Sequence, residues 1–120
     1  MNIDNRSSIL PEIEVSGFFQ VDIRVGQICQ VVDNVKARKP AYILTIDFGK
    51  IGKKTSSAQI TNNYSKDELL GKKVVAVVNF APKKIAGVKS EVLVLGAVCD
   101  RNGTVLIEPN LEVENGTRVA

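Results

Sequence analysis

The sequence predicts an all-β domain in which short strands close into a barrel. Apolar and polar residues alternate from Val21 to Val25 and again from Tyr42 to Phe48, which is the pattern of half-buried strands. Two continuous runs rich in β-branched residues, at 74–78 and 92–98, are typical of strands in a barrel or sandwich core. The length of 120 residues fits one domain with a sizeable core.

The chain is expected to begin with an arm and a bent first strand. Residues 1–15 show no clear period, so we expect an N-terminal arm followed by a folded domain over 16–120, with a helical turn starting near Ser16. In the first strand the apolar positions change parity after Gly26. A one-residue slip at a glycine indicates a bulge or sharp bend there.

The later elements complete the order of a known barrel. The second and third strands are expected at 42–48 and 55–60. A short helix follows, because Ser65 can cap it and Glu68 stands at the capping-box position. The two continuous runs supply the fourth and fifth strands, and residues 105–107 add a short final one. Five strands with a helix between the third and fourth, followed by a C-terminal extension, form an OB-fold barrel.

Charge is distributed very unevenly along the chain. Residues 36–89 hold twelve Lys or Arg and three acids, a balance of +9, whereas the remainder holds four basic and ten acidic residues, a balance of −6. The two parts together give the net charge of +3. Solvated lysines alone would explain some of this, but segregation on this scale favours a basic face that attracts polyanions.

Composition argues against several classes of protein. Histidine is absent, which removes imidazole metal ligands, the commonest general base and most catalytic triads. Cys29 and Cys99 lack CxxC spacing, and we expect them to be small core residues rather than a disulfide or metal site. Asp47 and Glu91 do not form a recognisable catalytic pair. Without a leader or an apolar run near ~20 residues, we expect a soluble, cytoplasmic, non-enzymatic protein with no cofactor and no membrane insertion.

The stretch from Asn79 to Leu95 is the best candidate for a binding site. It places a proline, a glycine, three lysines and a serine between two predicted strands, so a braced loop would hold cations in fixed positions. The lysines could contact RNA phosphates, and the apolar loop residues could form the floor of a polypeptide groove. The candidate ligand-binding residues are Arg24, Lys36, Arg38, Ser57, Gln59, Asn79, Phe80, Pro82, Lys83, Lys84, Ile85, Gly87, Lys89 and Ser90.

Several of these residues also have simpler roles. Arg24 could form a salt bridge with Asp22, and Ser57 and Gln59 could be edge-strand residues that face water. Asn79 is suited to fixing loop backbone, and Gly87 to a turn with positive φ. The whole loop could also be a plain strand connection whose apolar residues cap the barrel.

Three segments, in this order, resemble the tRNA-binding-domain family of OB-fold proteins. They are Asp22-x-Arg24-Val25-Gly26-x-Ile28, then Ser56-Ser57-Ala58-Gln59-Ile60-Thr61, then 79–95, with Glu108-Pro109 and Asn115-Gly116-Thr117 following. The resemblance runs from about Phe18 to the C-terminus. The sequence from Ile85 to Leu93 is similar to the loop of the free-standing CsaA-type members, which are described as secretion-related chaperones.

The resemblance implies a homodimeric chaperone for unfolded or export-bound polypeptides such as preproteins, with tRNA as a further ligand of the same basic face. It also implies that the arm and the C-terminal segment contribute to the dimer interface. The alternative is a tRNA-binding protein that recognises RNA shape and backbone. Members appended to synthetases typically carry Met-Arg-Gly where this chain has Ile85-Ala86-Gly87. Lysine does not replace the bidentate phosphate contact of that arginine.

Overall fold

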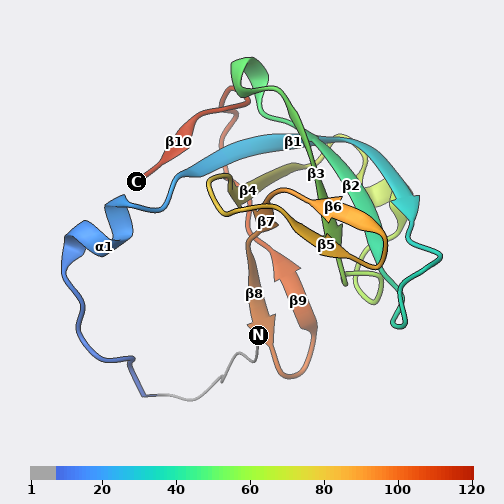
Figure 1. Ribbon diagram of the computed structural model, residues 1–120, viewed down its shortest axis with the longest axis horizontal. Coiled ribbons are helices and arrows are strands. Elements are labelled where there is room, and N and C mark those ends of the chain that lie inside the picture. Colours follow the sequence, from blue (N-terminus) through green and yellow to red (C-terminus); the bar gives the residue numbers. More distant parts are fainter. Residues whose placement is uncertain (1–7) are drawn as a thin grey trace.

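A strongly curved antiparallel sheet forms a nearly closed barrel in the computed structural model, which describes residues 8–120 (Figure 1). The sheet follows the order β3-β2-β1-β4-β7, and β10 pairs with the start of β1. This architecture confirms the predicted OB-fold barrel. The six strands are β1 (Ile23–Asp33), β2 (Tyr42–Asp47), β3 (Lys53–Ala58), β4 (Lys73–Val77), β7 (Leu93–Val94) and β10 (Arg118–Val119).

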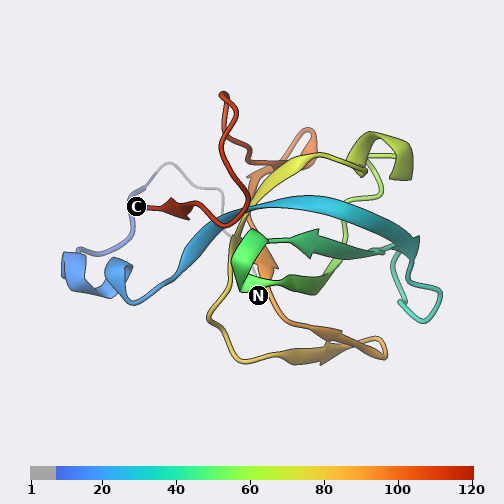
Figure 2. The same cartoon turned by 90° about the horizontal axis from the view of Figure 1, so that it is seen from above.

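Two small hairpins and three short helical segments complete the described part of the chain. The first hairpin joins β5 (Lys83–Ile85) to β6 (Val88–Ser90) and runs beside the barrel wall, as Figures 1 and 2 show. The second joins β8 (Gly96–Cys99) to β9 (Gly103–Leu106) and projects from one end of the barrel (Figure 1). The helical segments are α1 (Val15–Phe19), the 3-10 turn η1 (Gly49–Ile51) and α2 (Lys66–Leu69).

The short helix before β4 forms where its capping signals predicted it. Glu68 N–H donates to the Ser65 hydroxyl, and Ser65 N–H donates to the Glu68 carboxylate, so both halves of the capping box are present. The predicted strand at 92–98 is instead split at Leu95. There β7 ends on the barrel, and the chain leaves to form β8 in a separate hairpin. The predicted binding loop likewise contains the β5–β6 hairpin.

The first strand is buried on both sides, and this corrects the interpretation of Gly26. Val25 packs in one apolar cluster with β4, whereas Ile28 belongs to the main barrel core. The apolar positions change parity after Gly26 because the opposite side of β1 becomes buried there. Pairing of β1 with β4 runs through Gly26 without a shift, and the bulge lies further on, between Ile28 and Gln30. The predicted bulge therefore does not lie at the glycine.

Two further expectations have different outcomes. Phe48 and Leu44 are fully buried in the barrel core, as their alternation predicted. The prediction that Cys29 is a core residue is wrong, because Cys29 lies at the β1 bulge and its side chain is exposed. Cys99 is half-buried, and both cysteines are free thiols.

The N-terminal arm runs away from the barrel over residues 8–14 and ends in α1 (Figure 1). Its apolar side chains are exposed to solvent, Ile9, Leu10 and Ile13 among them. The predicted arm also includes residues 1–7, which lie outside the described residues. The boundary between arm and folded domain stays a prediction.

Replacing Gly26 with alanine is expected to destabilise the fold by about 1–3 kcal/mol, because it overpacks the core. The added methyl would lie 2.5 Å from Ile46 Cγ2 and 2.6 Å from the Phe48 ring. Urea denaturation monitored by circular dichroism would measure the change in free energy of unfolding. Gly17→Ala is the control, because its methyl would meet only Ile13 Cδ1 at 3.7 Å. Equal stability of Gly26→Ala and wild type would contradict this packing.

Candidate functional site

The β5–β6 hairpin has two chemically different faces. Lys84 pairs directly with Lys89, whereas Lys83 pairs with Ser90 and Ile85 with Val88. Side chains of paired residues lie on the same face and alternate along each strand. The register therefore places Lys84 and Lys89 together on one face, and Lys83, Ile85 and Ser90 on the other. The predicted cluster of lysines and apolar residues is divided between these faces.

A tight turn with two positive φ angles forms the tip of the hairpin. Ala86 has φ 46° and Gly87 has φ 81°. Such turns match the twist of a two-residue β-hairpin and usually need Asn or Gly at both positions. The expected positive φ at Gly87 is confirmed. Gly87 also lies against Lys36, since a Cβ built there would be 3.0 Å from Lys36 Cδ.

Hydrogen bonds along the edge of β3 hold the hairpin and Glu91, the residue after it, against the barrel. Glu91 N–H donates to Thr55 O at 2.8 Å, and Thr55 N–H donates to the Glu91 carboxylate at 3.1 Å. Ser57 N–H donates to Ser90 Oγ at 3.1 Å. The Thr55 hydroxyl donates to Lys89 O at 2.7 Å. These contacts fix the face of the hairpin that carries Ser90 toward the barrel.

Two adjoining pockets of about 420 and 210 Å³ lie where the hairpin meets the barrel, and we call them together the seam groove. They share a wall made by Ile85, Ser90, Val92 and Leu93. Among the described residues, the lining of the larger pocket is neutral and contains no aromatic ring. The larger pocket is completed by residues 56–60, Val94, Thr104 and Leu106, and the smaller by Phe80, Ala81, Lys83 and Glu91.

Cations gather beside the hairpin tip. The connection from β1 to β2 carries Lys36, Arg38 and Lys39, and Figures 1 and 2 both show it next to the tip of the β5–β6 hairpin. The close approach of Lys36 to Gly87 agrees with this placement. We call the five cations of this region the basic rim: Lys36, Arg38, Lys39, Lys84 and Lys89.

Acidic partners distinguish four other lysines from the basic rim. Within residues 8–120, Lys54, Lys66, Lys72 and Lys73 each have a carboxylate within 4.0 Å. For example, Lys66 Nζ lies 2.9 Å from Asp33 and Lys72 Nζ lies 3.0 Å from Glu108. In the same part of the chain, no member of the basic rim has an acidic partner within that distance. Its charge is therefore available to an external anion.

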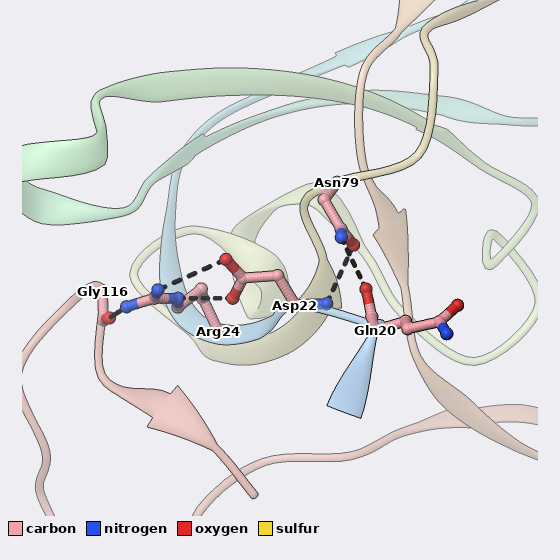
Figure 3. Close-up of polar contacts among 5 residues, drawn as sticks. All are labelled: Gln20, Asp22, Arg24, Asn79 and Gly116. Carbon is pink, nitrogen blue, oxygen red and sulfur yellow. Dashed lines mark hydrogen bonds and ion pairs between the residues drawn. The ribbon is translucent and has the colours of Figure 1, made fainter. Parts of the chain in front are cut away.

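Arg24 and Asn79 serve the scaffold (Figure 3). Arg24 Nε donates to Asp22 at 2.6 Å, and its Nη1 donates to Gly116 O at 3.1 Å. Asn79 accepts a hydrogen bond from Asp22 N–H and donates one to Gln20 O, both at 2.8 Å. Together they tie the start of β1 to the C-terminal segment and to the chain leading into the hairpin. The simpler roles considered for both residues are thus present in the structure.

The ion pair also changes the acidity of both partners. Hydrogen bonds from the Arg24 guanidinium hold the pKa of Asp22 below its usual value. The same contact raises the pKa of Arg24. Asp22 and Arg24 therefore form a charged pair at neutral pH.

The remaining predicted residues lie around the seam groove. Ser57 and Gln59 line its larger pocket, and Lys83 and Phe80 line the smaller one, where Phe80 is 51% exposed. Pro82 is exposed at the start of the hairpin. Sequence reasoning missed Val94, Thr104 and Leu106, which complete the groove from β7 and β9. Their positions depend on a long-range arrangement of strands, for which the sequence carries no local signal.

Two features are absent from the described residues. Within residues 8–120, no group of three or more His, Cys, Asp or Glu side chains is arranged to hold a metal ion. In that same range, every helix is too short or too polar to cross a bilayer.

Comparison with known proteins gives consistent matches. The family model described as "Putative tRNA binding domain" matches residues 23–118. The chain is 37% identical over 107 residues to a methionine–tRNA ligase of Pyrococcus horikoshii, covering 89% of this chain and 14% of that enzyme. The chain thus spans about a seventh of the length of this curated relative.

Two solved structures match over nearly the whole chain. The CsaA chaperone protein of Picrophilus torridus is 54% identical, with a TM-score of 0.86, over 91% of this chain and 100% of that one. The chaperone CsaA of Bacillus anthracis is 44% identical, with a TM-score of 0.83, over 92% and 100% respectively.

Asp22→Asn is expected to lower stability at neutral pH but not in acid. The folded-state pKa of Asp22 lies below the unfolded value of about 3.9, so its charge stabilises the fold above that pH. The contribution is lost as the pH falls through the lower folded-state pKa. Urea denaturation of wild type and variant at pH 6 and near pH 2.5 would measure it. In an Arg24→Gln background the pH-dependent difference should largely vanish. A difference that is equal at both pH values would contradict the pairing.

Proposed function

The chain belongs to the tRNA-binding domain family, and from this premise we propose that it is a non-enzymatic cytoplasmic chaperone for unfolded or export-bound polypeptides. The seam groove is the proposed binding site. The observation that carries this proposal is the neutral, largely apolar lining of its larger pocket, with Ile85 at its edge. Such a lining suits apolar segments of a non-native chain. The high similarity to two proteins named as CsaA chaperones supports it.

The basic rim supports tRNA as a second ligand. Its cations have no acidic partners among the described residues, and two of them, Lys84 and Lys89, stand directly opposite each other on one face of the hairpin. Cations held in this way can neutralise phosphates and release counterions. Because few aromatic rings are exposed nearby, we infer recognition of RNA shape and backbone rather than of sequence. The polypeptide and RNA sites are then adjacent but distinct.

We also propose that the protein acts as a homodimer through the N-terminal arm and the C-terminal segment. Phe18 and Phe19 of α1 contact each other edge to face, yet Phe19 remains 56% exposed. Ile13 in the arm and Leu111 in the C-terminal segment are also largely exposed. Exposed apolar side chains of this kind mark an interaction surface. Two copies would present two grooves to one client and gain from effective concentration.

Ile85→Asp is expected to abolish suppression of client aggregation, because it places a charge at the edge of the seam groove. Light scattering of a thermally denatured client protein, with and without the variant, would measure the protection. Val105→Asp is a matched control, because Val105 has the same 40% exposure and lies outside the groove. If both variants protect the client as well as wild type, the groove is not the polypeptide site.

Lys84→Glu with Lys89→Glu is expected to abolish binding of bulk tRNA in a gel-shift assay. Lys50→Glu with Lys53→Glu, near the β2–β3 connection, is the control with the same change in net charge. With four to six phosphate contacts, wild-type affinity should fall by roughly 10²- to 10³-fold between 50 and 200 mM salt. No shift by wild type at 50 mM salt, or equal losses in both variants, would refute the RNA site.

Phe19→Asp is expected to convert the dimer to a monomer, since it puts a charge in the proposed interface. Size-exclusion chromatography with multi-angle light scattering would measure the mass of each species. Leu70→Asp is the control, because Leu70 is 57% exposed but follows α2, away from the arm. A wild-type protein that is monomeric at micromolar concentration would contradict the proposal.

A further inference from the structure

Among the described residues, the barrel is closed between β3 and the hairpin by one main-chain bond, from Glu91 N–H to Thr55 O, and otherwise by bonds that involve side chains, with no strand ladder. Within residues 8–120, β3 has ladder pairing with β2 alone. On its other edge, Thr55 N–H donates to the Glu91 carboxylate and Ser57 N–H donates to the Ser90 hydroxyl. The N–H groups of Thr55 and Ser57 both point away from β2. They donate to side-chain oxygens, where a neighbouring strand would offer main-chain carbonyls.

The same edge continues into the seam groove with free main-chain groups. Gln59 follows Ser57 by two residues, so its N–H is expected on the same side of the strand. Among the described residues, the main chains of Gln59 and Val92 make no hydrogen bond. Both residues line the larger pocket. The groove therefore combines an apolar lining with main-chain donors and acceptors that have no partner within residues 8–120.

We propose that the seam groove binds an extended polypeptide segment as an added strand along residues 57–59, where the edge of β3 runs into the groove. This inference rests on the proposed chaperone function and specifies how the client is held. The main chain of the client would bond with Gln59 and, once Ser90 Oγ is displaced, with Ser57 N–H. Alternate client side chains would enter the apolar lining, and the intervening ones would face solvent.

The chemistry of the larger pocket favours a polypeptide over RNA, whereas the smaller pocket holds the exposed ring of Phe80 and Lys83. Unpaired bases are held by stacking on aromatic rings, and phosphates by cations. The larger pocket has neither, and the basic rim lies on the hairpin tip and opposite face. In the smaller pocket, Glu91 already bonds with Thr55, whereas Lys83 has no acidic partner within the described residues. A client segment with an acidic residue at one end would complement that lysine.

Recognition through the main chain would give the protein a tolerant client range. Strand addition uses groups that every residue except proline carries, so the sequence matters only at alternate positions. A chaperone that must hold many unrelated unfolded chains needs this property.

The direct test uses a fluorescein-labelled hexapeptide, Val-Thr-Val-Thr-Val-Glu, with both termini blocked. Only one edge of an added strand faces β3, so N-methylation of one alternate set of amides should weaken binding, and methylation of the other set should not. We expect a loss of roughly 10- to 100-fold for the sensitive set, as for two or three lost hydrogen bonds. Fluorescence anisotropy with wild-type protein would measure both. Equal affinities for the two methylated peptides would overturn strand addition.

A pair of protein variants tests the same contact by changing the protein and leaving the peptide unchanged. Gln59→Pro removes a main-chain N–H that has no partner within the described residues, so the barrel should be preserved. Gln59→Ala removes the side chain and keeps the N–H. We expect the proline variant to lose roughly 10-fold in peptide affinity relative to the alanine variant, with matching circular dichroism. If the proline variant does not fold, the methylated peptides with wild type still decide.

The outcomes separate this inference from the proposed function. Client protection and peptide binding without any edge asymmetry would refute strand addition and leave the chaperone function standing. Absence of both would refute the function and the inference together. If tRNA binding fails in Gln59→Pro and peptide binding does not, the groove takes RNA. If Gln59→Pro still binds peptide and tRNA, and light scattering shows that its mass falls from dimer to monomer, the groove takes a second copy of this chain. Either result would overturn the proposal.

Discussion

The rest of the barrel depends on the absence of a side chain at Gly26. Phe48 and Ile46 occupy the space where its Cβ would stand, so β1 and β2 pack closely over the core. Because of this contact, β1 can be buried on both sides, with Ile28 in the barrel core and Val25 in the second cluster. The second cluster is where β10 and the C-terminal segment join the barrel. This close contact thus lies on a strand that the barrel core and the outer cluster share.

The β5–β6 hairpin determines where binding chemistry is found. Its register directs Ile85 and Ser90 toward β3 and directs Lys84 and Lys89 away. Apolar and cationic groups that are adjacent in sequence therefore face different surroundings. This separation lets one small domain offer a neutral groove and a cationic surface without burying a lysine among apolar side chains, which would carry a desolvation cost. The two proposed ligands need not compete for the same atoms.

The sequence predicted the features that depend on local chemistry. The capping box of α2 joins residues three apart, and the positive φ of Gly87 belongs to a single turn. Alternation correctly placed Leu44 and Phe48 in the core. The exposed Cys29 was missed, because the strand bulge that exposes it depends on pairing with β2. The groove residues of β9 and the bond of Arg24 to Gly116 were beyond reach, whereas the pairing of Arg24 with Asp22 was among the roles considered. Gly116 is 92 positions from Arg24, and only the closed barrel brings them together.

An open strand edge carries a risk for any protein at cellular concentration, because copies can stack edge to edge and polymerise. The direct pairing of Lys84 with Lys89 bears on this risk. Two like charges side by side repel the same pair on another molecule, while a flexible neutral segment meets no such barrier. We therefore expect the Lys84–Lys89 pair to oppose fibre growth beside the edge of β3.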